Sequence, residues 1–386
     1  TTITFMIYPQ TEGIKPESVY EIRDAFEKAN PDIKVEIVTV PVGEIGNKLL
    51  AVFSSKSGEV DVSIHFNLSI FAAAGYLEPV PQDLLAMSGS FFKAPVQKAT
   101  WKGTLYGVPW FTGTKNWYYR KDMLQKAGLA EPPKDWAELR KWAEALKSED
   151  QFGLGVAGPD RDIFVEFLDL VHANGGRMFD ESGKPVLNSP EAVQALEFLA
   201  QLVKDGLVPP GFITHSVPEL EKLFFAGKIM ALADWPEFYS TARGNAPAPV
   251  KDQFAVGLMP GNKVRSAAFL AGWELIVSKD SKHKDLAWRW VRFLIEPAQM
   301  KKYALEAGHL PARVEVFGDP DLQKERPEFA QFARQMEYAY TDMYVPEYLQ
   351  IRPIVGKAVQ EAAQGQKTPK QALDAANAQI ADLLKQ

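Results

Sequence analysis

The sequence predicts an α/β fold built on a parallel sheet, and three observations support the prediction. Apolar runs of strand length alternate with helical repeats over residues 3–64. The same alternation resumes further along the chain. The length of 386 residues also allows two domains with a sizeable core. Strand–helix–strand repeats are typical of parallel sheets, in which ligands bind beyond the carboxyl ends of the strands.

The first five predicted elements alternate without interruption. Strands are predicted over residues 3–8, 35–40 and 60–64, where apolar side chains form runs or alternate. Helices are predicted from Pro16 to Asn30, with apolar residues three or four positions apart, and over residues 45–53. We therefore expect three loops at the ligand-binding edge of the sheet, at residues 9–13, 41–44 and 65–69.

The later elements carry the usual helix start and stop signals. Asp135 is a favourable N-cap for a helix over residues 136–146. Pro190 opens a helix that Gly206 ends, and Pro369 stands at the start of an amphipathic helix over residues 368–384. The remaining predictions are helices over residues 220–226 and 282–295 and strands over residues 152–156, 229–233 and 274–278.

Composition excludes several classes of function. Hydrophobic residues make up 46% of the chain, but no apolar run approaches the roughly 20 residues that span a bilayer. The net charge of −6 is spread along the chain, and without a basic stripe we expect no nucleic-acid partner. The chain has no cysteine, which excludes disulfides, thiol nucleophiles and thiolate metal sites.

Motifs that carry chemistry are almost absent. There is no G-x-S-x-G elbow, no P-loop and no H-E-x-x-H, and the five histidines are scattered, so we expect no metal and no cofactor. Gly153, Gly155 and Gly158 spell G-x-G-x-x-G, but they lie within an apolar run and Pro159 follows them. We interpret them as a glycine-containing strand leading to a loop. The 49 carboxylates leave a glycoside-hydrolase pair open in principle, although most are expected to be solvated surface acids.

Short segments in a fixed order point to a family. They are residues 60–62 (VDV), 72–79 (AAAGYLEP), 103–109 (GTLYGVP), 117–122 (WYYRKD), 132–136 (PPKDW), 174–176 (NGG), 225–228 (FAGK), 234–235 (DW), 271–273 (AGW) and 278–279 (SK). In order and spacing the chain resembles bacterial ABC-transporter extracellular solute-binding proteins of the maltose-binding type. The resemblance is collinear over nearly all 386 residues.

The resemblance implies a two-lobed, periplasmic-binding-protein-like (type II) fold: two α/β domains joined by a hinge with three crossings. The crossings would lie near residues 111–115, 269–273 and 310–315. Residues 1–111 and 273–312 would form the N-terminal lobe, and residues 112–272 and 313–386 the C-terminal lobe. The solute would lie in the cleft between them, and its binding would favour the closed form. The family does no chemistry, so no catalytic residue is expected.

The resemblance also implies partners and a location. We expect a small carbohydrate ligand, a membrane permease of the ABC type that receives it, and a monomeric binding protein. The chain starts at Thr1 without a methionine, so we expect an exported protein whose signal segment has been removed, either periplasmic or anchored to the cell surface by a lipid.

Aromatic residues are the first candidates for the ligand site, because the C–H face of a sugar ring stacks on flat apolar surfaces. Trp235 follows a predicted strand and stands where the family has a ligand-facing Trp. Trp273 lies beside Gly272 at the second crossing, and Tyr344 and Tyr348 flank Pro346 in a predicted aromatic loop. For each of these residues, packing in the core is the alternative interpretation.

Polar candidates come from the predicted loops, where hydroxyl groups need paired donors and acceptors. They are Gln10, Glu12, His65 and Asn67 in strand-end loops, Thr112 at the first crossing, and Asp160 and Arg161 in the loop that opens the second lobe. The acid that the family places near the first crossing is absent, since residues 112–114 read Thr-Gly-Thr. A maltose-like ligand is therefore in doubt.

Three alternative hypotheses about the function stay open. An acidic sugar or sugar phosphate could be held by Arg161, Arg243 and His65. A carbohydrate-active enzyme with an interdomain cleft would turn its sugar over instead of returning it. A metal- or oxyanion-binding clamp could use Tyr118 and Tyr119, although these belong to the ordinary WYYRKD segment.

Overall fold

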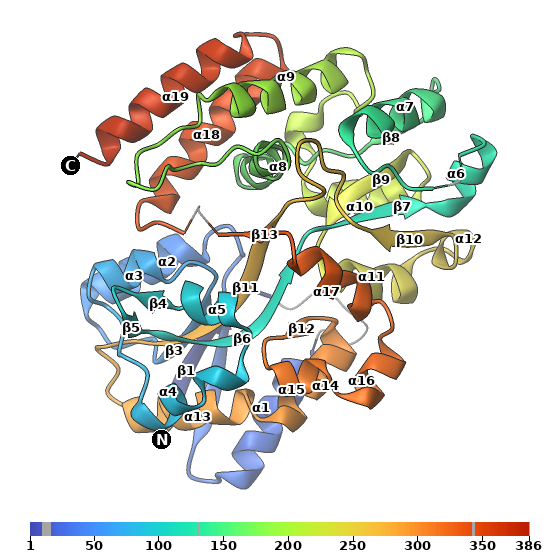
Figure 1. Ribbon diagram of the computed structural model, residues 1–386. Coiled ribbons are helices and arrows are strands. Elements are labelled where there is room, and N and C mark those ends of the chain that lie inside the picture. The colour runs from blue at the N-terminus through green and yellow to red at the C-terminus, as the bar shows by residue number, and fades with distance from the viewer. Residues whose placement is uncertain (10–16, 130, 342–343, 386) are drawn as a thin grey trace.

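The computed structural model describes residues 1–9, 17–129, 131–341 and 344–385, and Figure 1 shows two α/β lobes joined by crossing strands. The lower lobe in that view, called the first lobe below, is built on a seven-stranded sheet. The upper lobe, called the second lobe, is built on a four-stranded sheet. The predicted two-lobed α/β fold is confirmed.

The sheet of the first lobe has the order β12-β6-β11-β3-β1-β2, and β13 pairs with β11 beside this path. Its strands are β1 (Thr2–Ile7), β2 (Lys34–Thr39), β3 (Val62–His65), β6 (Gly107–Thr114), β11 (Ala268–Val277), β12 (Leu310–Pro311) and β13 (Ala339–Tyr340). As predicted, β1 is parallel to β2 and β3. The long strand β11 runs antiparallel to both β3 and β6, so the sheet is mixed.

Helices cover this sheet and bury its core. They are α1 (Ser18–Ala29), α2 (Ile45–Ser55), α3 (Ser69–Ala73), α4 (Gln82–Ala86), α5 (Lys93–Lys98), α13 (Lys284–Leu294), α14 (Pro297–Ala307), α15 (Val314–Phe317) and α16 (Pro320–Glu325), with the hairpin β4 (Thr100–Trp101) and β5 (Thr104–Leu105). Aromatic side chains fill the interior: the ring of Trp290 lies 5.7 Å from that of Phe5 and 5.0 Å from that of Phe26. A short 3-10 turn lies at Ser88–Ser90.

The sheet of the second lobe has the order β10-β7-β9-β8. Its strands are β7 (Asn116–Arg120), β8 (Phe152–Leu154), β9 (Ile229–Asp234) and β10 (Phe254–Gly257). Its helices are α6 (Lys121–Lys126), α7 (Trp136–Leu146), α8 (Asp160–Ala173), α9 (Pro190–Lys204), α10 (Val217–Phe225), α11 (Pro236–Asn245), α12 (Ala248–Lys251), α18 (Tyr348–Ala363) and α19 (Pro369–Leu383), with a 3-10 turn at Phe212–Thr214. Helix α17 (Phe329–Met336) lies beside β6 and β11 near the crossing strands. None of the helices among the described residues is both long and apolar enough to cross a membrane.

The three glycines of G-x-G-x-x-G are close-packing positions. A Cβ atom on Gly153 would lie 2.3 Å from the Cα atom of Ala143 in α7. A Cβ atom on Gly158 would lie 2.1 Å from the carbonyl oxygen of Phe212. Real Cβ atoms do not approach that closely, so glycine is needed for strand β8 and its following turn to pack against their neighbours. This agrees with the sequence interpretation and gives no support to a nucleotide site.

Several predictions of detail need correction. Asp160 and Arg161 lie in the first turn of α8 and not in a loop, because Pro159 precedes them with an extended backbone that starts a helix. Tyr348 opens helix α18 instead of lying in a loop. The strand predicted over residues 274–278 begins six residues earlier, at Ala268. The loop predicted at residues 9–13 and the helix start at Pro16 lie largely outside the described residues.

Candidate functional site

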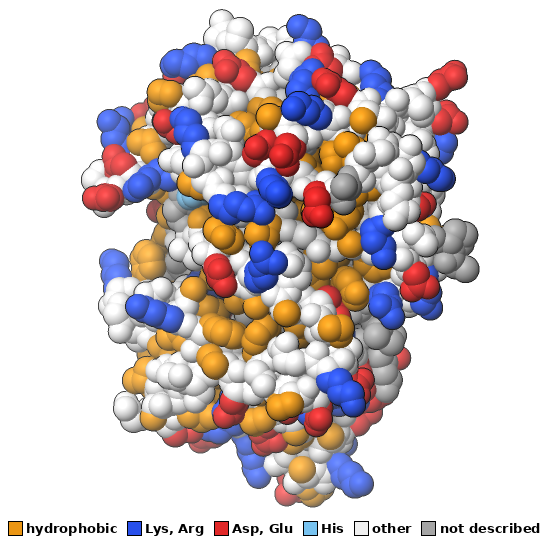
Figure 2. Space-filling view, turned by 45° about the vertical axis from the view of Figure 1, so that its right-hand side comes forward, with side chains coloured by type: hydrophobic (Ala, Val, Ile, Leu, Met, Phe, Trp, Pro, Cys, Tyr) orange, Lys and Arg blue, Asp and Glu red, His pale blue; other side chains and the backbone are white. Residues whose placement is uncertain are grey.

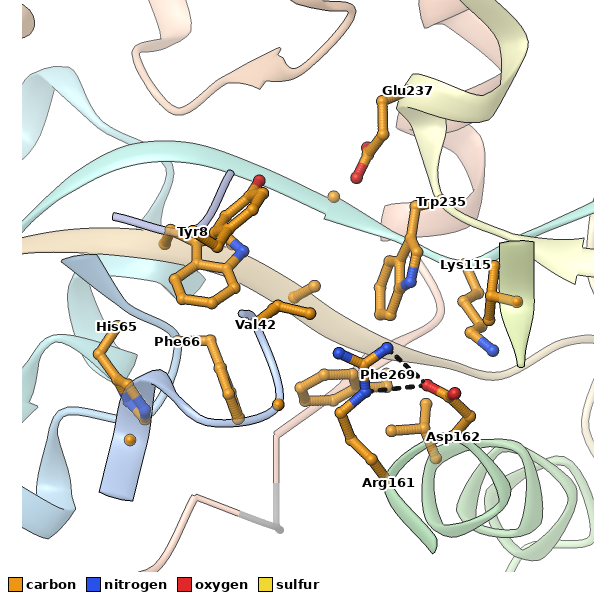
Figure 3. A pocket seen from close by; sticks show the side chains of 18 of the residues that line it. Tyr8, Val42, His65, Phe66, Lys115, Arg161, Asp162, Trp235, Glu237 and Phe269 are labelled. Carbon is orange, nitrogen blue, oxygen red and sulfur yellow. Dashed lines mark hydrogen bonds and ion pairs between the residues drawn. The ribbon is translucent and has the colours of Figure 1, made fainter. Parts of the chain in front are cut away.

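A cavity of about 390 Å³ lies between the two sheets (Figure 3). It has walls from both lobes and a floor made by the crossing strands β6 and β11. The first lobe contributes loops after β1, β2 and β3, as expected for the carboxyl ends of parallel strands. The volume is within the range of roughly 300–1,000 Å³ that small-molecule sites occupy. In Figure 2, hydrophobic side chains form a band at mid-height, at the level of the crossing strands β11 and β13 in Figure 1.

The wall of the first lobe is a cluster of aromatic rings. Tyr8, which directly follows β1, has its ring 4.8 Å from that of Trp273 on β11. Phe66, which directly follows β3, lies edge-on to Trp273 at 5.5 Å and edge-on to Tyr348 of α18 at 5.3 Å. The last contact joins the two lobes. The rings of Tyr8, Phe66 and Trp273 offer an apolar, partly exposed surface of the kind that packs on a sugar face.

The wall of the second lobe is centred on Trp235. This residue follows β9 and precedes Pro236, so the end of a strand and the start of α11 fix its backbone. Its carbonyl oxygen accepts a hydrogen bond from the Tyr118 hydroxyl at 2.8 Å. The ring meets Phe269 edge-on at 6.2 Å and lies 5.7 Å from the Lys115 ammonium group. Figure 3 shows the indole projecting into the space opposite Tyr8 and Phe66.

Among the described residues, each lysine or arginine that lines the cavity has a carboxylate partner. The Arg161 guanidinium lies 2.8 Å from the Asp162 carboxylate, the Arg352 guanidinium 3.3 Å from that of Asp160, and the Lys115 ammonium 3.1 Å from that of Glu166. Glu237 points into the cavity from α11, and its carboxylate lies 3.5 Å from Nδ1 of His309. The described part of the cavity wall is therefore polar in places without presenting a cluster of like charges.

Lys115 is almost fully buried among acids. Burial alone would lower its pKa, but the carboxylates of Glu166, Asp162, Asp169 and Asp234 raise the pKa above its usual value. Lys115 therefore stays protonated, and its ion pair with Glu166 holds the segment between β6 and β7 against helix α8.

Asp169, on the same helix, gives a pH prediction. Burial raises the pKa of its carboxyl to about 7, against the opposing effect of Lys115 and of hydrogen bonds from Tyr340 and Phe269. Because the folded-state pKa exceeds the unfolded value, its stabilising contribution is full below about pH 4 and is lost as the pH rises to about 7. An asparagine does not titrate, so the variant Asp169→Asn lacks this pH-dependent loss. We expect the free energy of unfolding of Asp169→Asn, relative to that of the wild type, to rise by at least about 1 kcal/mol from pH 5 to pH 8. Urea unfolding of both proteins at pH 5 and at pH 8 measures this change. The same difference between variant and wild type at both pH values would contradict the prediction.

The cavity brings together six of the predicted ligand residues. Those that line it are His65, Thr112, Arg161, Trp235, Trp273 and Tyr348. Burial lowers the pKa of His65 to about 3, and its Nδ1 lies 2.8 Å from the carbonyl oxygen of Asn67. His65 is therefore neutral at physiological pH, and the prediction that it could neutralise an anion is wrong.

Three other predicted residues lie away from the cavity wall. The Asn67 side chain donates to the carbonyl oxygen of Val345 at 3.0 Å and accepts from Ser69, which makes it a structural link between the lobes. The Tyr344 hydroxyl donates to the carbonyl oxygen of Leu270. Asp160 pairs with Arg352. Gln10 and Glu12 lie outside the described residues.

Sequence reasoning missed much of the cavity wall. The missed residues include Tyr8, Phe66, Lys115, Glu237, Phe269, His309 and Arg352. Tyr8 and Phe66 stand at or directly after the ends of two predicted strands, so the strand-end rule alone could have found them. Arg352 lies one helical turn after Tyr348, but α18 itself was not predicted.

Comparison with known proteins shows a clear relationship. The model of a family described as bacterial extracellular solute-binding protein matches residues 10–301. A probable ABC transporter-binding protein of Deinococcus radiodurans is 32% identical over 247 residues, 62% of this chain and 58% of that protein. A mannitol-binding protein of Pseudomonas aeruginosa is 25% identical over 412 residues, covering 100% of this chain and 93% of that protein.

Solved structures show the same fold. The maltose-bound MalE3 of T. maritima superimposes with a TM-score of 0.90 at 28% sequence identity, and the match covers 99% of each chain. The likeness therefore includes both lobes and the crossings between them.

Proposed function

Because this chain belongs to the bacterial extracellular solute-binding protein family, we propose that it binds a neutral mono- or oligosaccharide or sugar alcohol in the cavity between its lobes. The T. maritima structure similar to this chain holds maltose, and the P. aeruginosa relative binds mannitol, so the proposed ligand class has precedent among similar proteins. The solute would be released unchanged to the membrane permease of an ABC importer. An exported location follows from the same relationship.

The proposal rests on two features of the cavity: its aromatic walls, and its cationic side chains, which are paired with carboxylates. Trp235 faces Tyr8 and Phe66 across the cavity, which suits the apolar face of a sugar. Arg161, Lys115 and Arg352 each lie beside a carboxylate. An anionic solute would have to compete with those carboxylates for the cations, whereas hydroxyl groups can donate and accept within the existing pairs. This favours a neutral polyhydroxy compound over an acidic sugar or sugar phosphate.

Closure would couple binding to delivery. A solute that touches both lobes stabilises the closed form, because only that form completes its contacts.

We place the third crossing after Glu325 and not near residues 310–315, since β12, α15 and α16 pack with α14 of the first lobe. For the other two crossings we keep the predicted boundaries near residues 111 and 272 as part of the proposal.

Thermal unfolding against a ligand panel tests the proposal. The protein is refolded to remove any co-purified solute and is then heated with maltose, D-mannitol, D-tagatose, ribitol, D-glucuronate or glucose 6-phosphate. A neutral ligand at 100 times its dissociation constant should stabilise the folded state by about 2.7 kcal/mol. That ligand should be recovered intact afterwards. A shift with the two anions alone would contradict the neutral class, and conversion of the ligand would indicate an enzyme.

A further inference from the structure

Helix α8 contacts all three segments that connect the lobes. Glu166 accepts a hydrogen bond from Lys115, the residue between β6 and β7 at the first crossing, at 3.1 Å. Asp169, three positions further along the same helix face, accepts two hydrogen bonds of 2.8 Å through Oδ1. Its donors are the backbone N–H of Phe269 on β11 and the hydroxyl of Tyr340 on β13. One face of α8 therefore accepts hydrogen bonds from all three connecting segments.

These contacts are buried, so they are strong constraints. Asp169 is 2% exposed and Lys115 is 1% exposed. Glu166 also accepts from the backbone N–H of Ala157 at 3.3 Å, which fixes its carboxylate. The ring of Tyr340 stacks on that of His172 in α8 at 3.8 Å. Breaking a buried, charge-assisted contact of this kind leaves a polar group without its partner, which is costly.

The same helix presents its first turn to the solute cavity. Arg161 and Asp162 in that turn line the cavity, and so does Val165, which directly precedes Glu166 and lies one turn before Asp169. Phe269, whose N–H is held by Asp169, lines the cavity too and meets the ring of Trp235. The position of α8 therefore fixes both the cavity wall and the connecting strands.

We propose that Glu166 and Asp169 are positioning residues for solute binding, which anchor the three connecting segments to α8 and so hold the wall of the second lobe in its binding geometry. Bending between the lobes then falls on the first-lobe side of these anchors, where residues 112–114 pair with residues 270–272. Gly272 there has φ +125°, a conformation that favours glycine, and a register shift follows between Trp273 and Glu274. This inference rests on the proposed function.

Hydrogen exchange of the ligand-free protein tests the anchoring without any solute. We expect Asp169→Leu to speed backbone exchange over residues 268–271 and 339–341 on the order of tenfold, and Asp169→Asn, which keeps an acceptor oxygen, to change it little. Arg120→Met is the matched control. It replaces a different buried charged residue of the second lobe, whose guanidinium donates to the carbonyl oxygen of Phe224 at 3.1 Å at the far end of β7. Equal acceleration in the control, or wild-type rates in Asp169→Leu, would overturn the anchoring.

Affinity measured on the same proteins tests the link to binding. With whichever of maltose, D-mannitol, D-tagatose and ribitol binds the wild type, Asp169→Leu and Glu166→Leu should raise Kd about tenfold, and Asp169→Asn should restore most of the affinity. Arg120→Met should bind like the wild type. Unchanged affinity in both leucine variants would overturn the inference alone. If no panel member bound the wild type, the proposed function would fail first, and the positioning role would fall with it.

Discussion

Replacing Trp235 with alanine is expected to weaken solute binding at least about 30-fold, which corresponds to roughly 2 kcal/mol. The indole is the largest side chain on the second-lobe wall of the cavity, and it combines ring contacts to Phe269 with the nearby Lys115 ammonium group. Trp235 is only partly buried, so its truncation should change the free energy of unfolding much less than a core Trp would. Calorimetric titration of wild type and variant with the tightest neutral ligand of the panel measures the effect.

Trp101→Ala is the matched control for this experiment. Trp101 is also partly exposed, but it lies on β4 of the first lobe and lines a different groove. Its loss should leave Kd unchanged within about twofold, and Trp235→Phe should fall between alanine and wild type. Wild-type affinity in Trp235→Ala would show that the solute is held elsewhere.

Replacing Lys98 with methionine is expected to lower the free energy of unfolding by about 3–5 kcal/mol at pH 8. The Lys98 ammonium group lies 2.9 Å from the Glu274 carboxylate and donates to the carbonyl oxygen of Gly272 at 2.7 Å. Both side chains of the pair are 1% exposed. Removal of the cation leaves the Glu274 carboxylate buried without its counter-ion, which is the costliest way to break such a pair.

The loss should depend on pH in a defined direction. Burial raises the pKa of Glu274 to about 7 even with Lys98 opposing the shift, so loss of Lys98 raises this pKa further. A carboxyl with a raised folded-state pKa contributes most below its unfolded pKa and loses that contribution as the pH rises. We therefore expect Lys98→Met to be far less destabilised at pH 5.5 than at pH 8. The double variant Lys98→Met/Glu274→Leu should recover much of the loss. Urea unfolding that shows a pH-independent loss below about 1 kcal/mol would contradict this account.

The elements with strong local signals were predictable from sequence. Helix α9 has the predicted bounds because Pro190 opens it, the Ser189 side chain caps the N–H of Ala192, and Gly206 with φ +65° follows its end. Asp135 caps α7 as predicted. Strands β6 and β7 were missed because residues 107–120 are buried nearly throughout and show no alternation of apolar and polar residues.

The cavity was only partly predictable, and the reason is long-range contact. Trp235 and Trp273 were identified from strand ends and family landmarks, and both line the cavity. Asn67 and Tyr344 lie in loops, as several wall residues do, but their polar atoms make hydrogen bonds to partners 278 and 74 positions away instead of facing the cavity. Lys115 was missed because its significance comes from Glu166, 51 residues further along the chain.

A crystal structure of the refolded protein, grown with the neutral panel member that gives the largest thermal shift, is the most direct test of the proposed ligand site. We expect an intact sugar or sugar alcohol in the cavity of about 390 Å³, with its C–H face against Trp235 and its hydroxyl groups among the paired charges. A solute bound outside this cavity, or a cleaved product within it, would contradict the account.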